Sequence, residues 1–197
     1  MSADAEKRCS WCLGSDLYKH YHDTEWGVPC VDSSTLFELI NLEGAQAGLS
    51  WITVLNKREG YRKLFHEFDP VKVAKMSDAR LDKLCLDPSI IRHKGKIEAV
   101  RSNARAFLDM QHAGDDFSEY LWGFVGGSPV QNRFKSMDEV PASTPVSEAM
   151  SKALKKRGFK FVGPTICYAF MQAAGMVNDH LQHCPRYSAV KKMNKSA

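Results

Sequence analysis

The chain has 197 residues, of which 44% are hydrophobic and 25% are charged, and its formal net charge at pH 7 is +4. This length and composition exclude a disordered, fibrous or disulfide-dense protein, and they predict a single globular domain over residues 1–197. Because the charge is only mildly positive, any affinity for nucleic acid must come from local clusters of Lys and Arg.

The N-terminal sequence MSADAEKRCS lacks the apolar stretch of a secretory signal. No apolar run approaches the roughly 18 to 20 residues that are needed to cross a bilayer. We therefore expect a cytoplasmic protein with no membrane partner. In that compartment the six cysteines are expected to be thiols or metal ligands rather than disulfides.

Hydrophobic residues recur at helical spacing along the first half of the chain. Asp32 and the two serines after it offer N-caps for a helix that ends near Gly48. The segment 50–65 predicts a core helix, since its apolar residues fall on one stripe. Asp69, which is followed by proline, and Ser77 are expected to cap two further short helices.

The segment SIIRHKGKIEAVRSNARAFLDM predicts two helices joined by a tight turn at 92–96. Gly95 can take a backbone conformation there that is closed to other residues. Residues 126–144 are rich in Gly, Ser and Pro and are expected to form a long surface connection. Helices over 145–158 and 164–175 follow. Since no alternating strand pattern of convincing length is visible, the predicted fold class is all-α.

A first candidate site consists of two cysteines and two histidines from opposite ends of the chain. His180 and Cys184, spaced i to i+4, would share one face of a helix, and Cys9 and His22 lie near the N-terminus. Such a set suits tetrahedral zinc, and its filled coordination shell would make the metal structural. Spacing alone also permits buried thiols and surface histidines instead. The competing ligands nearby are Cys12, His20 and His183.

A second candidate is the segment LEGAQAGLSW, in which Glu43 is the one carboxylate of a largely apolar stretch. A buried carboxylate there needs a partner or a function, although an exposed position on a helix surface is the alternative. Aromatic residues near it could hold a planar or cationic ligand, or they could simply belong to the core. These residues are Trp11, Tyr18, Tyr21, Trp26 and Trp51.

The basic turn at 92–96 is a third candidate, because it could present backbone N–H groups and positive charge to a phosphate. A solvated basic loop is an equally good interpretation. A second run of Lys and Arg over 152–160 is assigned no role, since such runs more often mark an exposed helix face.

Five motifs in the same order resemble those of the bacterial 3-methyladenine DNA glycosylase I family, and the similarity spans residues 8–184. The resemblance implies the helix-hairpin-helix glycosylase fold with a zinc-bound element that joins the two termini. It implies that Zn²⁺ is held by Cys9, His22, His180 and Cys184. The motifs are YHDTEWGVP, LFELINLEGAQAGLSWITVL, IIRHKGKI, ALKKRGFKFVGPTICYAFMQAAG, and VNDH followed by Cys184.

The resemblance also implies a monofunctional enzyme that flips 3-methyladenine out of double-stranded alkylated DNA and hydrolyses its glycosidic bond. The products would be free 3-methyladenine and an abasic site. The family lacks the catalytic aspartate of the wider superfamily, so Glu43 is the expected catalytic residue. The expected base-binding residues are Tyr18, Tyr21, Glu43 and Trp51.

Contact with DNA is expected at two places. Leu49, beside Gly48, would fill the gap that the flipped base leaves in the duplex, and the hairpin would contact the DNA backbone. The expected hairpin residues are Arg92, Lys94, Gly95 and Lys96. We further expect a monomer with flexible tails at 1–8 and 185–197. The alternative function is a zinc-containing DNA-damage-binding protein that has the same fold without excision activity.

Overall fold

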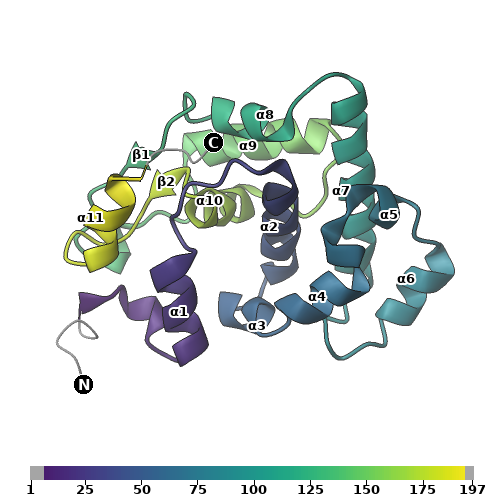
Figure 1. The fold of residues 1–197 in the computed structure, drawn as a ribbon, viewed down its shortest axis with the longest axis horizontal. Helices are drawn as coiled ribbons and strands as arrows, with labels where there is room; N and C mark the ends of the chain where they lie inside the picture. The colour runs from purple at the N-terminus through teal and green to yellow at the C-terminus, as the bar shows by residue number, and fades with distance from the viewer. Residues whose placement is uncertain (1–6, 194–197) are drawn as a thin grey trace.

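The structure is a computed structural model, and it describes residues 7–193. The regular structure of the described chain is helical apart from two strands of two residues each, which confirms the predicted all-α class (Figure 1). The α-helices are α1 (Asp16–Thr24), α2 (Ser33–Gln46), α3 (Trp51–Leu55), α4 (Arg58–Leu64), α5 (Pro70–Ala74), α6 (Asp78–Leu84), α7 (Lys94–His112), α8 (Phe117–Gly123), α9 (Pro145–Lys156), α10 (Pro164–Ala173) and α11 (Pro185–Lys191).

Short elements complete the fold. Within residues 7–193 there are three 3₁₀ turns: η2 (Ser10–Cys12) precedes α1, whereas η3 (His66–Phe68) and η4 (Met137–Glu139) lie between α-helices. Strands β1 (Val130–Gln131) and β2 (Val177–Asn178) pair in parallel over two residues each. This pairing lies partly within the predicted surface connection and is too short to show as an alternating pattern. No helix among residues 7–193 is long and apolar enough to cross a membrane.

The predicted N-caps bind the helix starts that they precede. Asp32 accepts a hydrogen bond from the Thr35 N–H at 2.7 Å, and Asp69 accepts two from the first turn of α5. Ser77 accepts one from Arg80 at the start of α6. Each cap satisfies N–H groups that have no partner within the helix. These local signals therefore fix where the helices begin.

Helix α2 lies at the centre of the molecule and packs against α10, α7, α3 and α8 (Figure 1). Phe37 of α2 meets Phe107 of α7, with ring centroids 5.1 Å apart. A buried amide pair adds a polar link, since Asn103 Nδ2 donates to Asn41 Oδ1 at 2.9 Å. Both faces of α2 are thus held by neighbours, which gives its C-terminal end a fixed position.

The single helix predicted over 50–65 is wrong, because the chain forms α3 and α4 with a break at Asn56 and Lys57. Lys57 leaves helical geometry at φ −108° and ψ 1°. The break turns Tyr61 toward the 85–93 segment, where its hydroxyl accepts a hydrogen bond from the Ile91 N–H at 3.3 Å. Tertiary contact therefore overrides the continuous apolar stripe.

The predicted turn at 92–96 is also wrong in its boundaries, because α7 already begins at Lys94. His93 caps this helix and accepts a hydrogen bond from the Lys96 N–H at 3.2 Å. Gly95 has ordinary helical geometry, so no special backbone conformation requires a glycine there. Its small size matters instead, because a Cβ at this position would lie 3.3 Å from the His93 ring and 3.6 Å from the Phe161 ring. The connection of the hairpin is therefore 85–93.

The C-terminal prediction needs two corrections. Residues 185–191 form α11 rather than a flexible tail, and Val190 of this helix is buried. His180 and Cys184 do not share a helix, because Cys184 is the N-cap of α11 and His180 lies in the turn before it. Arg8, within the predicted N-terminal tail, forms an ion pair with Asp23 at 2.8 Å. The tail residues 1–6 and 194–197 lie outside the described residues.

Candidate active site and metal centre

A cavity of about 190 Å³ lies beside the C-terminal half of α2. It is bounded by η2, α1, α2, α3, α10 and η4, which come from both halves of the chain. The structure brings all four predicted base-binding residues to its wall, together with the other two tryptophans of the predicted aromatic cluster, Trp11 and Trp26. The lining residues are Trp11, Tyr18, Tyr21, Trp26, Glu43, Gln46, Trp51, Met137, Ala169 and Gln172.

Aromatic rings form most of the wall. Tyr21 and Trp51 lie with ring centroids 5.5 Å apart. Trp11 meets Tyr18 edge to face at 4.8 Å and Trp26 at 5.0 Å. A wall of ring faces and edges is suited to planar ligands, and it attracts a cation more strongly than a neutral molecule.

Glu43 is the one carboxylate of the wall and is only 3% exposed. Burial raises its pKa to about 8. Among the described residues, Glu43 Oε2 and Trp51 Nε1 are buried without a hydrogen-bond partner. Buried polar atoms are normally satisfied, and leaving one without a partner costs about 1 to 3 kcal/mol. The cavity therefore offers an acceptor and a donor that only a ligand or water can use.

The carboxyl group also affects its aromatic neighbours. The pKa of Tyr18 is raised to about 12, first by burial and then by the nearby charge of Glu43. The pKa of Tyr21 is raised for the same two reasons in the same order. Both phenols are therefore neutral near pH 7, and the ionisable group of the wall that can change charge is Glu43.

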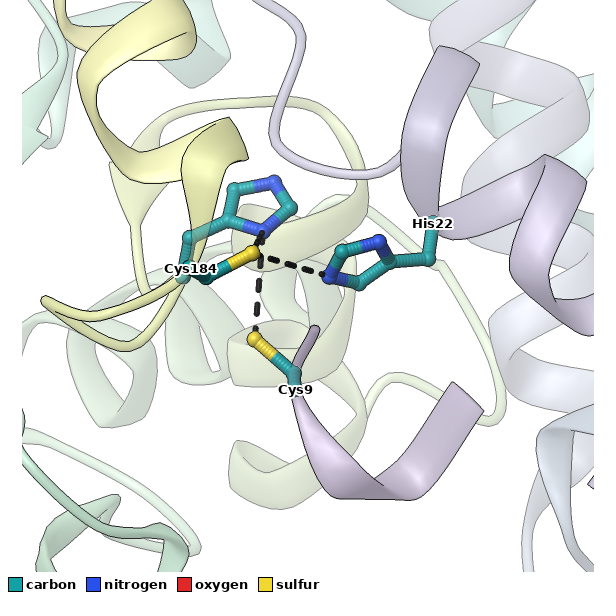
Figure 2. Close-up of side chains that lie close together, drawn as sticks. Cys9, His22 and Cys184 are labelled. Atoms are coloured by element: carbon teal, nitrogen blue, oxygen red, sulfur yellow. Dashed lines mark hydrogen bonds between the residues drawn. The ribbon is translucent and has the colours of Figure 1, made fainter. Parts of the chain in front are cut away.

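Four side chains form a compact cluster next to this cavity. The ligand atoms of Cys9, His22, His180 and Cys184 all lie within 4.8 Å of one another, and all four residues are buried. Figure 2 shows Cys9 and His22 approaching from the N-terminal segment and Cys184 from the C-terminal one. The structure thus joins the predicted ligands across the two ends of the chain, whereas His20 and His183 are exposed.

The distances within the cluster suit one tetrahedral ion. Cys184 Sγ lies 3.6 Å from His22 Nε2 and 3.8 Å from His180 Nδ1. Cys9 Sγ lies 3.9 Å from His180 Nδ1. Donor atoms at about 2.0 to 2.3 Å from a shared tetrahedral centre are spaced in this way. The donor set therefore fits a metal ion that prefers sulfur and imidazole ligands.

The second nitrogen of each imidazole is also held. His22 Nδ1 contacts Asp23 Oδ1 at 2.8 Å, and His180 Nε2 contacts the Trp26 carbonyl oxygen at 3.0 Å. Such outer contacts fix the orientation of metal-binding imidazoles. The hydrogen bond between the two thiols lowers the pKa of Cys184, which the contacts with His180 and His22 lower further, and it raises the pKa of Cys9, so one thiol of the pair ionises first. A thiolate is the form that a metal ion binds.

Comparison with known proteins decides the family. The model of the methyladenine glycosylase family matches residues 11–187. The chain belongs to this family. It is 56% identical over 185 residues to DNA-3-methyladenine glycosylase 1 of Escherichia coli (strain K12), which covers 94% of this chain and 99% of that relative.

Solved structures agree with this family assignment. A crystal structure of a 3-methyladenine DNA glycosylase I matches with a TM-score of 0.89 and 57% identity, covering 90% of this chain and 98% of that one. A structure that describes 3-methyladenine recognition by the Staphylococcus aureus glycosylase matches with a TM-score of 0.88 and 38% identity, covering 92% and 96%. The predicted family and the predicted all-α fold are therefore confirmed.

Four residues of this glycosylase-family cavity were missed by the sequence analysis: Gln46, Met137, Ala169 and Gln172. Gln46 follows Glu43 by three residues on α2, so helical spacing could have found it. The others come from distant segments and only the fold brings them to the wall. Gln172 Nε2 donates to the buried Asp179 at 2.9 Å, which fixes the orientation of the amide.

The predicted DNA-contact residues separate into two groups. Leu49 is 42% exposed and follows Gly48, whose φ of +76° makes the turn after α2. Arg92 and Lys94 are exposed at the start of the hairpin helix. Lys96 is different, because it is only 8% exposed and its ammonium group binds backbone carbonyls of the 45–47 segment. Its predicted role as a phosphate contact is therefore corrected.

Proposed function

We propose that this chain excises 3-methyladenine from alkylated DNA. Its relatives from Escherichia coli and Haemophilus influenzae are named DNA-3-methyladenine glycosylases. The observation that carries the proposal is the aromatic cavity with one buried, unpartnered carboxylate. The enzyme class is an N-glycosyl hydrolase of DNA.

The methylated base is itself a good leaving group. An adenine methylated at N3 bears a delocalised positive charge, so its glycosidic bond is weak and the base leaves as a neutral molecule. The enzyme therefore needs no strong acid to protonate the leaving group. Its task is to select the cation, and the ring faces of Trp51 and Tyr21 favour a cationic base by roughly 0.5 to 2 kcal/mol per desolvated contact.

Glu43 is the proposed catalytic residue. In the empty cavity its carboxyl group is mostly protonated near neutral pH, because its pKa is about 8. A cationic base in contact with it favours the ionised form, so binding releases the proton. The carboxylate then accepts a hydrogen bond from the amino edge of the base and offsets the positive charge that develops on the sugar. Trp51 Nε1 is a second group for recognition.

Hydrolysis by water is the proposed chemistry. Among the residues that the structure describes, no lysine lines the cavity. A lysine amine in the cavity could form a Schiff base with the sugar, from which strand cleavage would follow. The proposed product is therefore an abasic site in an intact strand.

Access to the base requires the duplex to open. Rotating a base out of the stack costs a few kcal/mol, and an apolar side chain can fill the space that it leaves. Leu49 is exposed beside Gly48, whose positive φ makes the turn after α2, and is the proposed wedge. Arg92, Lys94 and the backbone at Gly95 are the proposed phosphate contacts. We further propose a monomer that acts on double-stranded DNA in the cytoplasm.

Zn²⁺ is the proposed occupant of the Cys9, His22, His180 and Cys184 cluster. Two thiolates and two imidazoles at tetrahedral spacing are typical of structural zinc sites. Bound there, zinc would supply cross-linking of the two chain ends rather than reaction chemistry, because all four positions are filled by protein atoms.

The direct test is base release. The protein is incubated with DNA methylated by dimethyl sulfate, and released bases are identified by chromatography while strand integrity is followed on denaturing gels. We expect 3-methyladenine in the supernatant and strands that break only after alkali treatment. Binding to methylated DNA without any release would instead favour a damage-binding protein. Spontaneous nicking or trapping by borohydride would reject the hydrolytic, monofunctional chemistry.

A further inference from the structure

Lys96 is a buried cation next to the C-terminal end of α2, and the proposed chemistry leaves it without a role. It lies in the first turn of α7, on the hairpin that is proposed to meet the DNA backbone. Its ammonium group donates to the carbonyl oxygen of Ala45 at 2.8 Å and to that of Ala47 at 2.6 Å. Among residues 7–193 no carboxylate pairs with it, and burial lowers its pKa. A buried charge without a counterion is costly, so its two contacts call for an explanation.

The two carbonyls belong to the end of α2. Ala45 is in its last turn and Ala47 is its C-cap, so neither carbonyl continues the helical hydrogen-bond ladder. The C-terminal end of a helix carries partial negative charge and favours a cation. Lys96 therefore acts as a C-cap that is supplied by another helix.

This helix end carries the groups that act on the base and on the duplex. Glu43 and Gln46 line the cavity from the last turn of α2. Leu49 follows within three residues, and its N–H donates to the Gln46 carbonyl at 2.6 Å. Only Gly48 separates Ala47, whose carbonyl binds Lys96, from the exposed Leu49. A glycine does not restrict the backbone by itself, so the contact with Lys96 is what fixes this turn.

We infer that Lys96 is a positioning residue that links the hairpin to the 47–49 turn, so that docking of the hairpin on the DNA backbone places Leu49 at the opening duplex. The inference rests on the proposed glycosylase function. It assigns to Lys96 the opening of paired DNA rather than recognition of the base, because the helix α2, which carries the cavity residues, is also held by α10, α3 and α8.

The test compares duplex and single-stranded substrates. The variant Lys96→Met keeps the length of the side chain and removes the charge and both hydrogen bonds. Release of 3-methyladenine is measured in single turnovers from one methylated strand, with and without its complement. For Lys96→Met we expect the duplex rate to fall about tenfold or more and the single-strand rate to fall less than threefold. Binding of free 3-methyladenine, followed by tryptophan fluorescence, should stay within twofold of that of the unchanged chain.

Two further variants complete the design. Lys152→Met removes an exposed lysine of α9 and should leave both rates unchanged. Lys96→Arg keeps a buried cation with donors, and its duplex-to-single-strand ratio should lie between those of the unchanged chain and Lys96→Met. This variant also keeps the test open if the methionine variant fails to fold, which circular dichroism would report.

The outcomes separate the inference from the function beneath it. An unchanged ratio in both Lys96 variants, or a parallel loss of duplex rate, single-strand rate and free-base affinity, would overturn the inference and leave Lys96 a general stabiliser. If the unchanged chain releases no base from either substrate, the proposed function itself fails and the inference falls with it.

Discussion

The base cavity and the Cys/His cluster are neighbours, but they differ in whether their buried polar atoms have partners. In the cluster, every donor atom faces another and each second imidazole nitrogen has an outer partner. In the cavity, Glu43 Oε2 and Trp51 Nε1 are buried with no partner among the described residues. A metal site whose four ligands are all protein atoms stabilises the fold, whereas buried polar atoms without protein partners are available to bind a ligand. The comparison assigns structure to one site and chemistry to the other.

The two sites share a wall. Trp11 lies 5.3 Å from the His22 ring and Trp26 lies 4.6 Å from the His180 ring, and both tryptophans also line the cavity. The cluster therefore holds two rings of the cavity in place, although none of its own ligands lines it. Loss of the cluster should affect the cavity, but changes in the cavity should leave the cluster intact.

The largest expected effect comes from breaking the closed site. Cys184→Ala should abolish stoichiometric zinc in the purified protein and lower the thermal midpoint by more than about 10 °C, since structural zinc contributes on the order of 10 kcal/mol of binding free energy. Metal analysis and calorimetry measure both. Cys85→Ala, a half-buried thiol outside the cluster, is the matched control. A variant that retains full metal content and stability would contradict the structural assignment.

The next largest effect is expected on excision, from a change in the base cavity. Glu43→Gln keeps the shape of the side chain but removes the negative charge, and we expect excision of 3-methyladenine to slow about 100-fold. Affinity for undamaged duplex should change less than twofold, because Glu43 lies inside the cavity. Single-turnover release and fluorescence anisotropy measure the two quantities. Equal losses in both would place Glu43 in general DNA binding instead.

How far the sequence predicts the molecule differs between these sites. N-caps and prolines located most helix starts, because those signals act on adjacent residues. The break after Leu55 and the helix α11 depend on distant contacts and were missed. In the cavity, a motif led to Glu43 and Trp51, whereas Gln172 reaches the wall only through folding. Lys96 was misassigned because basic side chains are usually exposed, and its partners are carbonyls that no sequence pattern reveals.

A smaller effect is expected where the active-site face meets DNA. Leu49→Ala should lower excision from duplex DNA about tenfold, equivalent to ~1.4 kcal/mol, while leaving affinity for free 3-methyladenine unchanged. Val71→Ala, an exposed apolar residue of α5, is the control and should have no effect. Retention of the full duplex rate by Leu49→Ala would remove it as the wedge.

The last prediction concerns stability rather than rate, namely the pH dependence of the free energy of unfolding. The folded-state pKa of Glu43 is about 8, above its ordinary value of 4.5, so the folded chain binds more protons than the unfolded chain between these values. The contribution of Glu43 to stability is then present at pH 4.5 and is lost as the pH rises toward 8. Urea unfolding at pH 5 and pH 8 should show a smaller decline for Glu43→Gln than for the unchanged chain. Identical declines would mean that Glu43 does not titrate in this range.

Selectivity for a charged base is the claim on which the rest depends. It is measured by incubating the chain with methylated DNA and quantifying released 3-methyladenine and released adenine in the same chromatogram. The account predicts abundant 3-methyladenine and no adenine above the level seen without protein. Release of adenine at a comparable rate, or release of neither base, would contradict it.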